Sequence, residues 1–178
     1  MIQQGAVAIV GENNSAITSL VALMAKPTMI PTMTYGSSAT DFSNKVLYPN
    51  VLRPVPAVST SAVFAAALCK KLGWTRVSLL STDDTFAKSC SSAFTQGVAA
   101  RQMTLVTSEV FFSAGDATKS VANIKASKVR VIFFCGVTGD LATALRQGYA
   151  AGIGNKRNGQ RKDRTNLTSL FVPTYIRV

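Results

Sequence analysis

Few residue types in this sequence could carry chemistry, and the missing ones restrict its function. The 178 residues include no histidine, which removes Ser-His-Asp and Cys-His catalysis and the commonest general base. Residues 115–120 end like a phosphate-binding loop but lack the second glycine before the lysine, and residues 152–157 lack the third glycine of a dinucleotide-binding turn. We therefore expect no enzyme activity and no cofactor.

The three cysteines, Cys69, Cys90 and Cys135, are widely spaced and form no Cys-x-x-Cys motif. Metal binding by thiolates is therefore not expected. Each cysteine lies in an apolar stretch, so buried free thiols are the default interpretation. One disulfide, with one cysteine left over, is also compatible with this spacing.

Polar residues follow the first two strand-like runs and could bind a ligand. Asn14 and Ser15 lie between the first run and a helical pattern, and the free N–H groups and positive dipole at a helix start bind anions such as a carboxylate. Ser37 and Ser38 follow the next run, so their hydroxyls are predicted to face the same crevice. The structural alternative is that Ser15 caps the helix and the loop serines serve solubility.

A pair of carboxylates, Asp83 and Asp84, follows a strand-like run that ends at Ser81. The loops after parallel strands face ligands in α/β folds. These carboxylates form either a solvated turn or, at Asp84, a contact to an amine group of a ligand.

The elements that must position these residues alternate between strand and helix patterns. Prolines at 49, 54 and 56 exclude helix over residues 48–56 and predict an extended crossing segment. Strands are expected at 5–10, 29–34, 75–81, 104–112 and 129–135, helices at 15–26, 59–72, 85–101, 116–127 and 138–151, and a last strand-like run at 170–178. This alternation predicts an α/β fold with parallel sheets and flanking helices.

The crossing segment divides two expected strands from three, which predicts two lobes. Residues 1–55 are a partial first lobe with a hinge at about 49–56, residues 56–153 are a second lobe, and residues 154–178 are a basic divergent tail. Two strands are too few for an independent core, so we expect an incomplete piece of a larger domain.

The formal charge is +11, and six of the 19 basic residues lie within residues 154–178. A basic α/β interaction or nucleic-acid-binding domain that uses residues 155–164 is therefore the competing interpretation, the other being a solvated tail. Basic residues are not interleaved with stacking aromatics, so nucleic acid is not the expected partner. No apolar run approaches the roughly 18–20 residues of a membrane span, and no signal peptide is visible.

Three segments carry a resemblance to a known family. The segments PTMTYGSSATDFSNK (31–45), YPNVLRPVP (48–56) and LGWTRV (72–77) together resemble the receptor family ligand-binding region. This is the two-lobed, type I periplasmic-binding-protein-like "flytrap" domain of class C G-protein-coupled receptors, natriuretic peptide receptors and bacterial branched-chain amino acid binding proteins. The resemblance covers about residues 5–153 and is strongest to metabotropic glutamate and γ-aminobutyric acid type B receptors.

The resemblance implies specific residue roles. It implies that Ser15 and Ser38 hold an amino-acid-like ligand in the first lobe. Phe86 stands where the glutamate branch has an aromatic residue after the second lobe's first strand, although it lacks a phenolic hydroxyl. Val137 stands where the γ-aminobutyric acid branch has a tyrosine.

The resemblance also implies a function. We expect the extracellular ligand-binding region of a transmembrane signalling receptor at the plasma membrane, which acts by hinge closure and forms a homo- or heterodimer. Membrane attachment would come only from downstream segments. Asn13 and Asn166 begin N-glycosylation sequons, and we expect Asn13 to be unmodified because a glycan there would fill the crevice.

Overall fold

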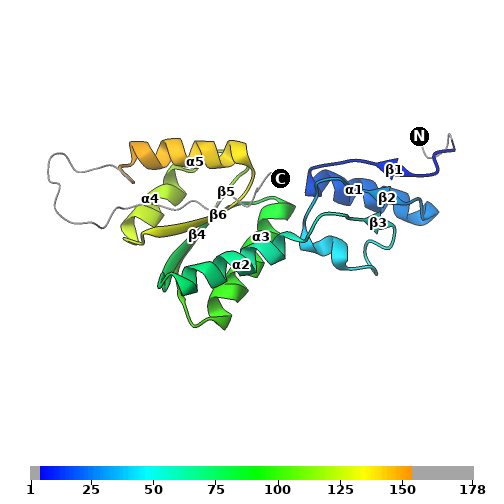
Figure 1. Ribbon diagram of the computed structural model, residues 1–178. Helices are drawn as coiled ribbons and strands as arrows, with labels where there is room; N and C mark the ends of the chain where they lie inside the picture. Colours follow the sequence, from blue (N-terminus) through cyan, green and yellow to red (C-terminus); the bar gives the residue numbers. More distant parts are fainter. Residues whose placement is uncertain (1–4, 154–178) are drawn as a thin grey trace.

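Two separate parallel sheets organise the chain in the computed structural model, which describes residues 5–153 (Figure 1). The first sheet has the order β1-β2-β3, and the second has the order β5-β4-β6. Every strand pair in both sheets is parallel. The expected α/β fold with parallel sheets and flanking helices is therefore confirmed.

The first sheet contains very short strands. They are β1 (Ile9–Val10), β2 (Thr32–Met33) and β3 (Val51–Leu52). The helix α1 (Ser15–Ala25) and the 3-10 turn η2 (Lys26–Thr28) connect β1 to β2, and the 3-10 turn η3 (Thr40–Ser43) lies between β2 and β3. The strands expected at 5–10 and 29–34 are thus each reduced to two paired residues.

The third strand of this sheet corrects the expectation of two strands. Val51 and Leu52 pair with β2, although they belong to the segment expected to be an extended crossing. The prolines flank these two residues and do not interrupt them, so the ladder forms. Asn50 supports the strand with its side-chain amide, which donates to the backbone carbonyls of Ala22 (3.2 Å) and Ile30 (3.1 Å).

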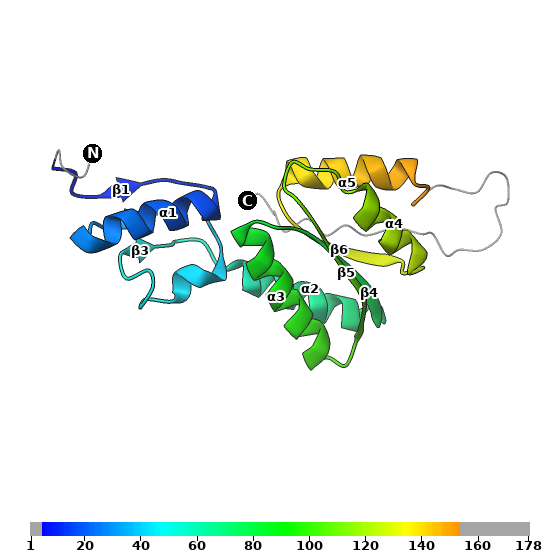
Figure 2. The ribbon, with the colours of Figure 1, turned by 180° about the vertical axis from the view of Figure 1, so that it is seen from behind.

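The second sheet has longer strands and a helix layer on each face. Its strands are β4 (Arg76–Thr82), β5 (Thr104–Phe111) and β6 (Val131–Cys135). Its helices are α2 (Val58–Lys71), α3 (Thr85–Ala100), α4 (Thr118–Ala126) and α5 (Thr138–Ala150). The helices α2 and α3 cover one face and α4 and α5 the other (Figures 1 and 2). These elements lie within two residues of the positions expected from the sequence.

The core of this second sheet follows from strand periodicity. Every residue of β6 is buried, and alternate side chains point to opposite faces. Phe133 packs toward α2 and α3, where its ring stacks on Phe94 at 4.1 Å between centroids. Ile132 and Phe134 pack toward α4 and α5. A sheet buried on both faces explains the continuous apolar run of β6.

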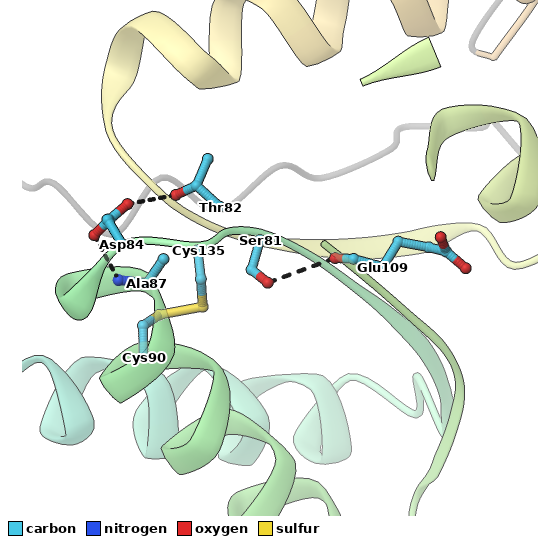
Figure 3. The surroundings of a disulfide bond; sticks show 7 residues. All are labelled: Ser81, Thr82, Asp84, Ala87, Cys90, Glu109 and Cys135. Atoms are coloured by element: carbon cyan, nitrogen blue, oxygen red, sulfur yellow. Dashed lines mark hydrogen bonds between the residues drawn. A yellow bond between two sulfur atoms is a disulfide. The ribbon is translucent and has the colours of Figure 1, made fainter. Parts of the chain in front are cut away.

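A disulfide joins Cys90 of α3 to Cys135 at the end of β6 (Figure 3). The default interpretation of free thiols is therefore wrong for these two cysteines. They are 45 residues apart in sequence, yet their Cα atoms lie 5.8 Å apart because α3 packs on β6. Cys69 is a free, buried thiol, and burial raises its pKa.

Several expectations fall on residues 154–178, outside the part that the structure describes. They concern the basic tail, the interaction segment at 155–164, the sequon at Asn166 and the strand-like run at 170–178. Within residues 5–153, none of the helices has both the length and the apolar character required to cross a bilayer.

Candidate functional site

The candidate site beside the first sheet begins at the first turn of α1. Asn14 is the N-cap of this helix, and its side-chain oxygen accepts the backbone N–H groups of Ala16 (2.8 Å) and Ile17 (3.3 Å). Ser15 therefore does not cap the helix, and the capping alternative is wrong for this residue. Its side chain is only 4% exposed, and its Oγ accepts the backbone N–H of Ala39 at 3.3 Å.

The two loop serines differ in their surroundings. Ser37 is fully buried, and its Oγ hydrogen-bonds to Thr18 Oγ1 (2.6 Å) and donates to the Glu12 carbonyl (2.9 Å). Its hydroxyl therefore fastens the loop to α1. Ser38 is half-buried, its carbonyl accepts the backbone N–H of Val58 at 2.8 Å, and its hydroxyl makes no hydrogen bond to another described residue. Ser38 has the hydroxyl that remains available.

Arg53 holds the same loop from the segment between β3 and α2. Its Nη1 donates to the carbonyl of Ala39, and its Nη2 donates to Ser43 Oγ at 2.9 Å. Partial burial lowers the pKa of its guanidinium, which remains charged because the ordinary pKa of arginine is so high. No motif or spacing in the sequence marks Arg53 as a functional residue.

The candidate residues of the second sheet lie at the carboxyl ends of its strands. Asp84 is the N-cap of α3, and its carboxylate accepts the backbone N–H of Ala87 (3.0 Å) and the hydroxyl of Thr82 (2.6 Å) (Figure 3). Its neighbour Asp83 accepts the backbone N–H of Ser113 at 3.0 Å. Asp84 therefore caps α3 and Asp83 binds the loop after β5, while both residues remain partly exposed to solvent.

Phe86 and Val137 occupy contrasting environments. Phe86 is 8% exposed and packs in the core with Ala87 and Cys90, so most of its ring is already covered. Val137 is at the N-cap position of α5 with its side chain 43% exposed. Only Val137 offers substantial free surface.

One buried carboxylate lies outside the set of site residues predicted from the sequence. Asp140, in the first turn of α5, is 4% exposed and accepts the Ser113 hydroxyl (2.9 Å) and the Ala114 backbone N–H (2.7 Å). An acidic residue in a helix's first turn is the sequence signal that could have drawn attention to it. Nearby, hydrogen bonds from Thr118 lower the pKa of Asp116.

A polar pocket of about 390 Å³ lies between η3 and the helices α2 and α3. It includes residues from both sides, among them Thr40, Ser59, Thr85 and Lys88. Thr40 contributes its backbone N–H to Ser89 Oγ at 3.3 Å, and α1 also contacts α3 (Figure 2). Thr40 lines this pocket, and Ser38 lies two residues before Thr40 in the sequence. Neither Ser15 nor Ser38 lines the pocket itself.

A larger pocket of about 470 Å³ lies between α4 and α5 and is mainly apolar. None of the predicted ligand residues lines it. Over residues 5–153, His, Cys, Asp and Glu side chains form no group of three or more that could hold a metal ion.

Comparison with known proteins identifies a receptor family. The sequence profile described as "Receptor family ligand binding region" matches residues 1–157. Human G-protein coupled receptor family C group 6 member A is 31% identical over 87 residues, which cover 49% of this chain and 9% of that receptor. Rabbit metabotropic glutamate receptor 6 is 32% identical over 90 residues, which cover 51% of this chain and 10% of that receptor.

A third relative is cat taste receptor type 1 member 3, which is 25% identical over 99 residues. Those residues cover 56% of this chain and 11% of that receptor, so the chain spans about a tenth of the length of the relatives it matches. The profile match nevertheless covers most of the chain. With its parallel α/β fold, the chain therefore belongs to the receptor family ligand-binding regions.

Proposed function

We propose that this receptor ligand-binding region binds an amino-acid-like molecule between two lobes, which are built around the two sheets and joined by residues 53–57, between β3 and α2. The observation that carries the proposal is the bond from the Ala39 N–H to Ser15 Oγ. It puts Ser15 beside the loop that contains Ser38, whose hydroxyl is available. Both residues follow neighbouring parallel strands, β1 and β2, and the carboxyl ends of such strands are the usual ligand side.

The hydroxyls of Ser15 and Ser38 suit a ligand carboxylate. A serine hydroxyl can accept one hydrogen bond and still donate its own hydrogen, so Ser15 can accept from Ala39 and donate to the ligand. The N–H groups of Ala16 and Ile17 are already engaged by Asn14. The carboxylate is therefore expected to depend on the hydroxyls and on the positive end of the α1 dipole.

The second lobe is proposed to supply the remaining contacts. An ionised carboxylate has about four acceptor positions, so Asp84 can accept an ammonium donor beyond its bonds to Thr82 and Ala87. Val137 is proposed to border the ligand at the end of β6 through its exposed side chain, and Phe86, after β4, through the small part of its ring that the core leaves uncovered. Contacts to both lobes would form only in the closed arrangement, so ligand would shift the equilibrium toward closure rather than undergo a reaction.

We further propose that the region lies on the extracellular side of a membrane receptor. The relatives are named as receptors. The Cys90–Cys135 disulfide supports an oxidising compartment, because disulfides persist outside the cytosol and are rare within it.

The surface of α1 supports pairing with a second receptor chain. Its buried positions are small, namely Ser15, Thr18, Ala22 and Ala25. Its larger residues Ile17, Leu20 and Met24 are 47%, 64% and 74% exposed, on the side that faces away from these buried positions. The helix has no charged residue, so a contact made through α1 would not bring like charges face to face.

Calorimetry on the complete ligand-binding region of the receptor tests the proposal against the basic-interaction alternative. Titration with a panel that includes L-glutamate should give saturable binding that changes little between low and high salt. Binding of an oligonucleotide that weakens steeply with salt, together with no response to any amino acid, would favour the alternative suggested by the +11 charge.

A further inference from the structure

Three consecutive residues, 38–40, connect the loop after β2 to α2 and α3, the two helices that cover one face of the second sheet. We call these three residues the junction. Its bonds run from Val58 N–H to Ser38 C=O (2.8 Å), from Ala39 N–H to Ser15 Oγ (3.3 Å), and from Thr40 N–H to Ser89 Oγ (3.3 Å). Val58 begins α2, Ser15 begins α1 and Ser89 belongs to α3.

These bonds act on two successive peptide planes. In the plane between Ser38 and Ala39, the carbonyl is held by α2 and the N–H by Ser15 of α1. In the plane between Ala39 and Thr40, the N–H is held by Ser89 of α3. Because a peptide unit is planar and rotates as one body, a change at one edge of either plane moves the group at its other edge.

Arg53 holds the carbonyl edge of the second plane. Its Nη1 donates to the Ala39 carbonyl and its Nη2 anchors the guanidinium on Ser43 Oγ. Hydrogen bonds from a charged donor are roughly twice as strong as neutral ones, and the planar guanidinium fixes two donors at once. Ala39 is itself fully buried, so the plane has little room to turn while this clamp is in place.

We infer that Arg53 is a positioning residue that fixes the junction, and so couples ligand occupancy at Ser15 and Ser38 to the placement of α3. The coupling to ligand rests on the proposed ligand site. The clamp of Arg53 on the Ala39–Thr40 peptide plane does not, because its hydrogen bonds form without ligand. Arg53 itself is not proposed to touch the ligand.

The experiment compares Arg53→Met with Lys45→Met in the complete ligand-binding region. Lys45 is the matched control, because its Nζ also donates to a backbone carbonyl, that of Val51 in β3 (2.6 Å), which lies outside the junction. NMR hydrogen exchange at the Ala39 and Thr40 amides reports on the clamp without ligand. Calorimetry with L-glutamate and other amino acids then reports on coupling.

Arg53→Met should speed exchange at both amides and weaken amino-acid binding by about tenfold, while Lys45→Met changes neither. Arg53→Lys should restore part of both properties, because it keeps the charge and one donor group. Unchanged exchange in Arg53→Met overturns the inference whether or not ligand binds. Faster exchange with unchanged affinity overturns the coupling.

A milder variant keeps the inference testable if Arg53→Met does not fold. Ser89→Ala removes only the acceptor of the Thr40 N–H and should speed Thr40 exchange and weaken binding in the same direction. Combined with Arg53→Lys, its effect on affinity should be less than additive, because both changes act on one peptide plane. Strict additivity contradicts the inference. Absence of binding by the wild type contradicts the proposed function instead, and the exchange data then decide on the clamp.

Discussion

Ser15 Oγ accepts the backbone N–H of Ala39 at 3.3 Å, although the two residues are 24 positions apart in the sequence. The bond joins the first turn of α1 to the loop after β2, and the carbonyl of the intervening Ser38 is held by Val58. The Ser15 side chain and the Ser38 backbone are therefore held in place before any ligand arrives. Such preorganisation lowers the ordering cost of binding.

Replacing Asn14 with alanine should lower the free energy of unfolding by about 1 kcal/mol, because this side chain caps α1. Denaturant titration of the variant measures the change. Asn14→Ser is the control, since serine is also a good cap, and it should retain most of the stability. Equal stability of Asn14→Ala and wild type would show that the cap contributes nothing.

Reduction of the Cys90–Cys135 disulfide should lower stability by roughly 2–4 kcal/mol, because the bridge closes a loop across 45 residues. Calorimetric melting with and without a phosphine reductant provides the measurement. The Cys90→Ala/Cys135→Ala variant should not respond to reductant. Alkylation in denaturant should label one thiol before reduction and three after it, and three labelled thiols before reduction would contradict the bridge.

Asn13 should carry no glycan when the receptor is expressed in a secretory host. The third residue of its sequon, Ser15, is a proposed ligand contact, so a glycan on Asn13 would fill the proposed crevice. A side chain added at Gly36 would meet Asn13 Oδ1 at 1.9 Å, so the Asn13 side chain lies closely over the loop. Glycopeptide mass spectrometry that finds Asn13 modified would argue against a ligand site at the start of α1.

The outward face of α1 provides a test of receptor pairing. Leu20→Lys places a charge between Ile17 and Met24 on this face. It should weaken self-association by at least about tenfold, as measured by sedimentation velocity. Val46→Lys is the control, because Val46 is 87% exposed outside α1 and should leave association unchanged. Equal association of wild type and Leu20→Lys would remove α1 from the interface.

The sequence predicted the second sheet and its helices well because each element is long enough to show a period. The fully apolar run of β6 and the helical pattern of α3 are examples. The strand β3 was missed because two paired residues, Val51 and Leu52, show no period at all. Neighbouring prolines also pointed to a crossing segment, although they only flank the strand.

The residues of the candidate site could be predicted only where their place after a strand determines where they lie. Ser15 and Ser38 follow adjacent parallel strands, so their proximity could be expected from the chain order. The burial of Phe86 and the binding of Ser37 to Thr18 depend on how separate elements pack. The hydrogen bond from Arg53 to Ala39 also depends on this packing. No local pattern reports such contacts, and the ligand roles of Phe86 and Val137 stay predictions.

The most direct test of the central claim is calorimetric titration of an amino-acid panel into the wild-type ligand-binding region and into Ser15→Ala and Ser38→Ala. Hydrogen bonds to a charged group contribute about 1.5–3 kcal/mol each, so each variant should bind roughly ten- to a hundredfold more weakly. Melting temperatures recorded in parallel separate this loss from instability, since Ser15→Ala also loses the bond to Ala39. Ser37→Ala is expected to lower the melting temperature and to leave the affinity close to that of the wild type, because its hydroxyl binds Thr18 and Glu12. A ligand that binds the wild type and both serine variants equally well would contradict the account.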